Sequence, residues 1–213
     1  MVNFQTFESV SKQSYPFPYL TYLPENYDPA KQYPLVVFLH GAGERGNDRA
    51  SLARHGWFKQ AEQGEQFPFI MVSPQCPEGK YWGSYIESLN VFLDTILETY
   101  PVDRKRVYLT GLSMGGTGTW LWSLSNPERF AAVAPICGTG VYWFAERLVD
   151  KPLWVFHGDK DEIVPFFESE HMVESLRKRG GDPKFTVLPG VGHNAWEYAY
   201  NQELVDWFLQ YSL

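Results

Sequence analysis

The chain has 213 residues, of which 44% are hydrophobic and 20% are charged, and its formal net charge is -7. These values are typical of a soluble globular domain with a sizeable core, and they exclude a disordered chain. The acidic balance and the lack of a long lysine and arginine cluster exclude a nucleic-acid partner.

Alternating strand-like and helix-like segments run from about residue 35 to the end of the chain. This alternation predicts one α/β domain over residues 1–213 with a mostly parallel sheet. Residues 19–23 carry β-favouring side chains between prolines, and the stretch up to Tyr22 predicts one or two antiparallel strands before this part. Apolar runs, which are typical of strands buried on both faces, occur at residues 35–39, 69–72, 107–110, 131–136, 153–157 and 185–188.

Three amphipathic helices are predicted among and after these strands. Ser84 and Glu87 fit a capping box at the start of the first helix, which Pro101 ends. The second runs over about residues 168–179, with a cationic last turn and two glycines after it. Residues 51–66 are polar and less regular, and their sequence is compatible with either a helix or a small lid. The third helix has one apolar stripe, formed by Leu204, Trp207, Phe208 and Tyr211.

A G-x-S-x-G motif follows the strand predicted at residues 107–110, and a helix-like segment follows the motif. Strand, motif and helix in this order predict a sharp turn that lifts the Oγ of Ser113 above the sheet. The turn also places the N–H of Met114 at a helix amino terminus, where it can stabilise an oxyanion. A purely structural glycine-rich turn is the alternative.

A serine hydroxyl becomes nucleophilic when an imidazole accepts its proton, and a carboxylate holds that imidazole. On α/β-hydrolase folds the order along the chain is serine, acid, histidine. Of the five histidines, only His171 and His193 come late enough. His171 falls within a predicted helix, where a surface histidine is the ordinary interpretation. His193 lies in a glycine-rich loop after the last strand, and we predict it as the general base.

The acid is expected in the loop after the strand at residues 153–157. Asp159, Asp161 and Glu162 compete for this role. Asp159 alternatively caps the turn, and Glu162 alternatively lies in solvent. The spacing alone does not choose among the three.

The second oxyanion donor is expected in the loop after the first buried strand. That loop contains glycines at positions 41 and 43, which let the backbone approach a substrate oxygen closely. We predict the N–H of Ala42 as the donor, with that of Gly43 as the alternative. His40 precedes the serine and is interpreted as structural.

Four segments of the chain, at residues 39–46, 111–116, 157–165 and 192–196, together resemble the small α/β-hydrolase esterases. The group includes phospholipase/carboxylesterase and dienelactone-hydrolase-like enzymes, and relatives of polyhydroxybutyrate depolymerases and feruloyl esterases. The resemblance covers nearly the whole chain and implies an α/β-hydrolase fold without a large cap domain. Its pattern H-G-x-x-D-x-x-V-P places the catalytic aspartate at Asp161.

The resemblance also implies cofactor-free hydrolysis of a small-molecule ester through an acyl-enzyme. We predict a serine carboxylesterase for short-chain or aryl esters. A serine peptidase or thioesterase with the same triad is the alternative, and a non-catalytic binding protein on the same fold is a further one. Aromatic residues make up 17% of the chain, so some rings can line a pocket while most form the core. The pocket candidates, each with core packing as its alternative, are Trp82, Tyr142, Trp143, Phe166 and Trp196.

Signals for export, membrane insertion and metal binding are not expected. Residues 1–8 lack a basic segment followed by an apolar run, and no 18-residue apolar stretch occurs, so we expect a cytoplasmic protein. No cluster of cysteine and histidine has metal-ligand spacing. Cys76 and Cys137 are expected to be free thiols, although a single bridge stays open because both follow strands at one edge of the sheet.

Overall fold

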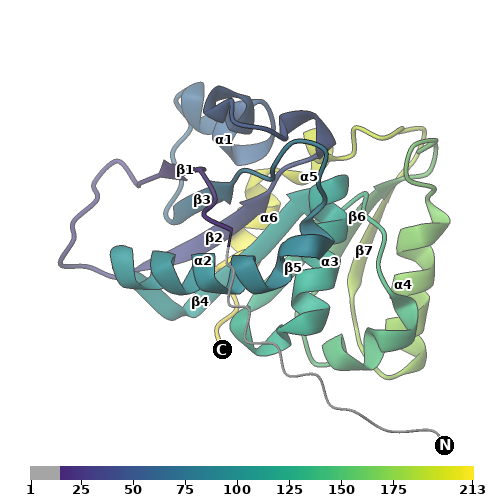
Figure 1. The fold of residues 1–213 in the computed structure, drawn as a ribbon. Coiled ribbons are helices and arrows are strands. Elements are labelled where there is room, and N and C mark those ends of the chain that lie inside the picture. The colour runs from purple at the N-terminus through teal and green to yellow at the C-terminus, as the bar shows by residue number, and fades with distance from the viewer. Residues whose placement is uncertain (1–14) are drawn as a thin grey trace, which may run out of the picture.

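The structure, a computed structural model, describes residues 15–213. The expectation for residues 1–8 lies outside the described residues. A seven-stranded sheet runs through the molecule, with helices on both faces (Figure 1). None of the described helices is long and apolar enough to cross a membrane.

The sheet has the strand order β1-β3-β2-β4-β5-β6-β7. Only β1 runs antiparallel to its neighbour, β3, and the other pairs are parallel. The predicted α/β architecture with a mostly parallel sheet is therefore confirmed. The strands are β1 (Tyr19–Tyr22), β2 (Tyr33–Leu39), β3 (Ile70–Pro74), β4 (Val102–Leu112), β5 (Ala132–Ile136), β6 (Trp154–Gly158) and β7 (Lys184–Leu188).

Strand β4 is longer than the strand predicted from the apolar run at residues 107–110. It begins at Val102, and residues 103–106 include charged side chains that lie at or near the surface. Its register with β2 shifts between the pairs that Tyr33 and Leu35 form. The early part of β4 thus extends beyond the buried sheet, so a search for continuous apolar residues misses it.

The helices are α1 (Gly56–Glu62), α2 (Ile86–Thr99), α3 (Met114–Ser125), α4 (Phe167–Lys178), α5 (Trp196–Ala199) and α6 (Gln202–Phe208). The short 3-10 helices are η1 (Ala42–Glu44), η2 (Arg49–Ala53), η3 (Trp82–Tyr85), η4 (Pro127–Arg129) and η5 (Tyr142–Leu148). The segment at residues 51–66 is thus largely helical. The last predicted helix is shorter than expected, because Tyr211 lies beyond α6.

The capping box predicted at Ser84 and Glu87 is wrong. Helix α2 begins at Ile86, and Tyr85 precedes it without a side-chain cap. Ser84 lies inside η3, where its N–H donates to the carbonyl of Tyr81. Because this tighter turn runs directly into α2, the serine is not at the helix start.

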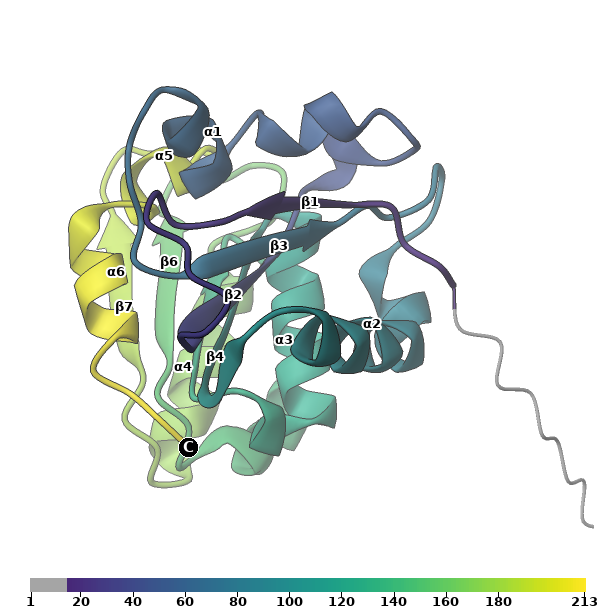
Figure 2. The ribbon, with the colours of Figure 1, turned by 90° about the vertical axis from the view of Figure 1, so that its left-hand side faces the viewer.

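Two apolar layers cover the sheet, one on each face. Helices α2, α3 and α4 pack on one face, and α1 and α6 pack on the other (Figure 2). The expectation that most rings form the core holds for six of the eight tryptophans, which are buried. These are Trp57, Trp82, Trp120, Trp122, Trp154 and Trp207.

Helix α3 approaches the sheet too closely for side chains at the start of the helix. A Cβ on Gly115 would overlap the carbonyl of Leu39 in β2, and one on Gly116 would overlap the carbonyl of Ile136 in β5. Glycine at both positions therefore lets the amino terminus of α3 sit against the ends of two strands.

Replacement of Gly116 by alanine should lower the free energy of unfolding by about 3 kcal/mol or more, because the methyl overlaps backbone that cannot move aside. Urea titration followed by circular dichroism measures this change. Gly43→Ala is the matched control, since a Cβ there meets nothing within 4 Å. Equal unfolding midpoints for the two variants would contradict the packing described.

Candidate active site

Ser113 connects β4 to α3 in a backbone conformation that L-residues rarely adopt, with φ 55° and ψ -118°. Its N–H donates to the carbonyl of Ile136 at 2.9 Å, and its carbonyl accepts from the N–H of Thr117 at 2.9 Å. These bonds hold the turn between β5 and the first turn of α3. The strained conformation is the one expected at a serine that is presented above the edge of a sheet.

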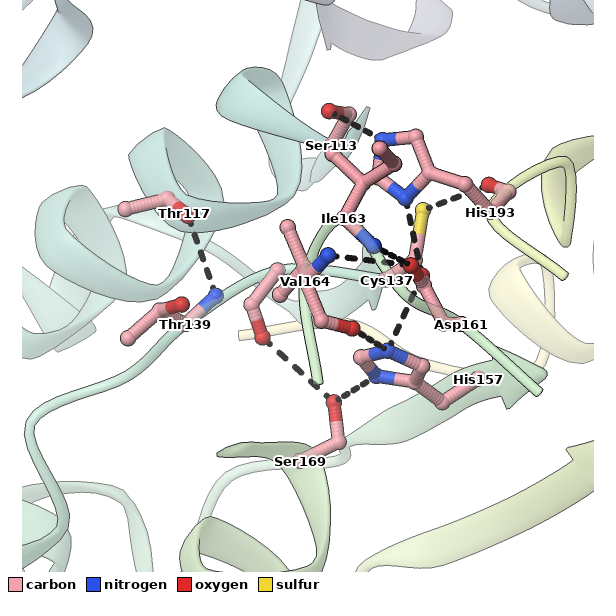
Figure 3. A network of polar contacts seen from close by, with 11 residues as sticks. Ser113, Thr117, Cys137, Thr139, His157, Asp161, Ile163, Val164, Ser169 and His193 are labelled. Carbon is pink, nitrogen blue, oxygen red and sulfur yellow. Dashed lines mark hydrogen bonds and ion pairs between the residues drawn. The ribbon is translucent and has the colours of Figure 1, made fainter. Parts of the chain in front are cut away.

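The imidazole of His193 lies between Ser113 and Asp161 (Figure 3). Its Nε2 is 2.7 Å from the Oγ of Ser113, and its Nδ1 is 2.8 Å from Oδ2 of Asp161. Because Nδ1 faces a carboxylate, it carries the proton, which leaves Nε2 to accept the serine hydroxyl proton. The side chain of His193 is 20% exposed, so the imidazole is open to a substrate from outside.

Asp161 follows β6, and its side chain is fully buried. Its Oδ1 accepts the N–H groups of Ile163 and Val164, each at 2.9 Å. The competing acids have other surroundings: Asp159 accepts the N–H of Gly190 at 2.7 Å, and Glu162 is exposed. Of the three acids that the sequence left open, only Asp161 contacts the imidazole of His193.

Two backbone N–H groups stand at the positions in the fold from which oxyanion donors are expected. Met114 is the first residue of α3, and Ala42 is the first residue of η1, in the loop after β2. Neither N–H has an acceptor among residues 15–213. Gly43, the alternative donor, lies within the same short helix. The arrangement matches the loop and helix start from which such donors come.

His40 lies below this loop with its hydrogen bonds filled. Its Nε2 accepts the N–H of Cys76 at 2.9 Å, and its Nδ1–H donates to the carbonyl of Gly41 at 2.6 Å. Burial is the main cause that lowers the pKa of His40 to about 4. The neutral imidazole thus ties the loop after β2 to the end of β3, which agrees with a structural role.

The five aromatic candidates for the pocket lie in different surroundings. Trp82 is 1% exposed, and its Nε1–H donates to the carbonyl of His40 at 3.1 Å, so it belongs to the core. Phe166 stacks on Phe185 with ring centroids 5.7 Å apart. Tyr142 and Trp143 are exposed on η5. The structure therefore favours core packing for Trp82 and does not bring the five rings together.

Trp196 is the pocket candidate that lies against the imidazole. Its ring meets that of His193 edge to face at 5.4 Å, and that of His55 at 5.4 Å. It also forms one wall of a cleft of about 360 Å³, whose other walls come from α1 and the start of α5. Trp196 therefore contacts both the imidazole of His193 and this cleft.

Two polar groups beside the site were not identified from the sequence. Glu44 is 6% exposed, and its Oε1 lies 3.6 Å from Nε2 of His55. His157, at the end of β6, contacts Asp161 from the side opposite to His193 (Figure 3). Glu44 and His157 both lie in segments that carry the resemblance, at residues 39–46 and 157–165. The spacing of residues in the sequence did not predict a role for either side chain.

Sulfur, oxygen and nitrogen atoms of Cys137, Asp161 and His193 lie within 4.8 Å of one another. Oδ2 and Nδ1 already bond to each other, and the Cys137 thiol donates to the carbonyl of His193 at 3.5 Å. Burial raises the pKa of that thiol well above its ordinary value. We therefore assign these atoms to hydrogen bonding around the imidazole and not to a metal ion. Cys137 and Cys76 are both buried free thiols.

A family model described as "Putative esterase" matches residues 16–208. A bifunctional acetylxylan esterase/xylanase of Neocallimastix patriciarum is 27% identical over 161 residues, which are 73% of this chain and 23% of the relative. The chain thus spans about a quarter of that relative's length.

Solved structures share the fold. A thermostable esterase is 34% identical with a TM-score of 0.80, over 92% of this chain and 60% of that one. A ferulic acid esterase is 21% identical with a TM-score of 0.75, over 90% of this chain and 91% of that one. The second likeness shows the fold alone. Together with the sheet topology, these likenesses establish the α/β-hydrolase fold.

The depressed pKa of His40 predicts a loss of stability in acid. The unfolded chain takes up this proton below pH 6.5 and the folded chain only below about pH 4, so stability falls as pH drops through that window. The difference corresponds to about 3 kcal/mol of unfolding free energy. His40→Gln, whose amide oxygen can accept the N–H of Cys76 without taking up a proton, should lose correspondingly less in urea titrations. Equal losses in parent and variant would contradict the neutral, buried His40.

Proposed function

The chain belongs to the esterase family, and we propose that it is a serine carboxylesterase with Ser113 as nucleophile. In this proposal His193 is the general base, and Asp161 holds the imidazole in the tautomer that the reaction needs. The observation that carries the proposal is the pair of contacts at 2.7 Å and 2.8 Å that joins the three side chains. The N–H groups of Met114 and Ala42 are the proposed oxyanion donors.

The reaction follows from this geometry. The Oγ of Ser113 attacks the ester carbonyl carbon while Nε2 of His193 accepts the hydroxyl proton. The carbonyl oxygen becomes an oxyanion, which the N–H groups of Met114 and Ala42 stabilise. The bond to the alcohol oxygen then breaks, and His193 gives its proton to the leaving alkoxide. Water, deprotonated by His193, attacks the acyl-enzyme and releases the acid and the free serine.

The proposed substrates are esters of short or aromatic acids. The acetylxylan esterase/xylanase carries a name that refers to acetyl esters, which supports small acyl groups here. The partly buried ring of Trp196 beside His193 offers an aromatic surface, which suits a planar acyl or alcohol group. Exposed Tyr142 and Trp143 are further candidates for contact with larger substrates.

Replacement of Ser113 by alanine should lower kcat for p-nitrophenyl butyrate by roughly three or more orders of magnitude, because no other group can form the acyl-enzyme. Steady-state release of p-nitrophenol measures the change. Ser125→Ala, an exposed serine on the same helix, is the matched control and should keep the parent rate. An S113A variant as active as this control would refute the proposed nucleophile.

A substrate panel tests the proposed specificity. We expect kcat/KM for acetyl, butyryl and feruloyl esters to exceed that for octanoyl esters by about tenfold, because the cleft beside Trp196 is lined mostly by polar residues, such as Lys59 and Gln60, from which a long chain gains little. Matched peptide amides and thioesters in the same panel should react more slowly than the best ester. A preference for octanoate, or for an amide or a thioester, would contradict the assignment.

A further inference from the structure

Asp161 contacts two histidines through the same oxygen. Its Oδ2 lies 2.8 Å from Nδ1 of His193 and 3.2 Å from Nε2 of His157. The side chains of Asp161 and His157 are both fully buried. Figure 3 shows His157 on the side of the carboxylate away from Ser113. The ordinary triad needs only the first of these two imidazoles, so the second requires an explanation.

The surroundings of His157 determine which ring nitrogen carries its proton. Nε2 faces two acceptors, Oδ2 of Asp161 and the carbonyl of Val164 at 2.9 Å, so Nε2 is the protonated nitrogen. Nδ1 lies 2.7 Å from the Oγ of Ser169 in α4, and it accepts the hydroxyl proton of that serine. Every polar atom of the ring thus has a partner.

A neutral imidazole is consistent with this burial. Desolvation is the main cause that lowers the pKa of His157. The titratable groups around it are Asp161 and His193, with the Cys137 thiol on the far side of the carboxylate. Burial keeps that thiol protonated. His157 therefore acts on the carboxylate as a neutral hydrogen-bond donor and not as a cation.

We propose that His157 is a positioning residue for ester hydrolysis, which aims the Asp161 carboxylate at His193 and moderates its basicity. The inference rests on the proposed function. Oδ1 accepts two backbone N–H groups and Oδ2 accepts the Nδ1–H of His193, while the Nε2–H of His157, which donates to the carbonyl of Val164, also lies 3.2 Å from Oδ2. This set fills the acceptor sites of a carboxylate that has no contact with solvent.

Removal of one donor changes the remaining three bonds. Without the Nε2–H of His157, more negative charge stays on Oδ2, and the carboxylate attracts the proton on Nδ1 of His193 more strongly. The imidazolium form of His193, which arises during proton transfer, then becomes more favourable. The carboxylate can then also rotate about its bond to Cβ, so the imidazole of His193 is aligned less well with the hydroxyl of Ser113.

The test is the pH dependence of kcat/KM for p-nitrophenyl acetate in variants at position 157. His157→Phe removes the donor and keeps a ring of similar size, whereas His157→Gln returns an N–H close to the position of Nε2. For His157→Phe we expect the acid limb to move up by about half a pH unit. We expect kcat per active site to fall about tenfold, with little change in KM. His157→Gln should recover most of both changes.

Ser169→Ala keeps the test usable if His157→Phe does not fold. It removes the hydroxyl that donates to Nδ1 and leaves Nε2 in place, so the N–H of His157 becomes a weaker donor. The acid limb should then move in the same direction by a smaller amount. Phe185→Leu is the packing control, since Phe185 stacks on Phe166, whose ring meets that of His157 at 5.9 Å. It should lower stability without moving the acid limb.

Active sites are counted by fluorophosphonate labelling, so that a smaller fraction of folded protein is not mistaken for a lower kcat per active site. An unchanged acid limb and an unchanged kcat per labelled site in His157→Phe, or in Ser169→Ala where the former does not fold, would overturn the inference. If the variant only became less stable, His157 would be structural alone. If His157 proved to be structural alone and Ser113→Ala were inactive, only the role of His157 would be refuted. An active Ser113→Ala would refute the proposed function itself.

Discussion

The backbone turn at Ser113 is the constraint on which the site depends. A residue other than glycine with φ 55° costs on the order of 1–3 kcal/mol, and surrounding structure must hold it in place. Here the close contact of β4 and α3 does so, because Gly111 and Gly115 pack backbone against backbone. The same turn aims the hydroxyl at His193 and leaves the N–H of Met114 free at the start of α3. A looser contact between strand and helix would lose both features together.

Parallel pairing brings the other groups to this turn. Strands β2, β4 and β6 end at one edge of the sheet, as does β7, so the loops that follow them meet there. Ser113 and His193 are 80 positions apart in the chain and in hydrogen-bond contact in space. His157 is the next-to-last residue of β6 at this edge, which places it beside the carboxylate that the next loop presents. The network of donors around Asp161 is therefore a consequence of the sheet topology as well as of the local sequence.

Much of the fold and of the site follows from patterns in the sequence. Apolar runs locate the six strands from β2 to β7, and the order of serine, acid and histidine in loops after strands identifies Ser113 and His193. The choice of Asp161 came from the resemblance, and the structure supplies its physical reason: Asp159 turns to the N–H of Gly190 instead. Periodicity does not report which face a ring packs against, so Trp82 was a candidate for the pocket although it is buried.

Other features required coordinates for a different reason. The 3-10 turn η3 displaces Ser84 from the start of α2, and a four-residue spacing rule cannot detect such a turn. The contact between His157 and Asp161 depends on side-chain direction at a strand end. Glu44 is similar, because its burial beside His55 results from the fold of the loop after β2. Patterns thus located the loops, and packing decided which of their polar groups meet.

A trapping experiment shows whether Ser113 carries the acyl group during turnover. The protein is mixed rapidly with p-nitrophenyl butyrate, quenched in acid during the first turnovers, and digested for mass spectrometry. We expect a butyryl group on the peptide that contains Ser113, together with an early release of p-nitrophenol equal to the number of active sites. Turnover with the butyryl group on another residue, or on none, would contradict this expectation.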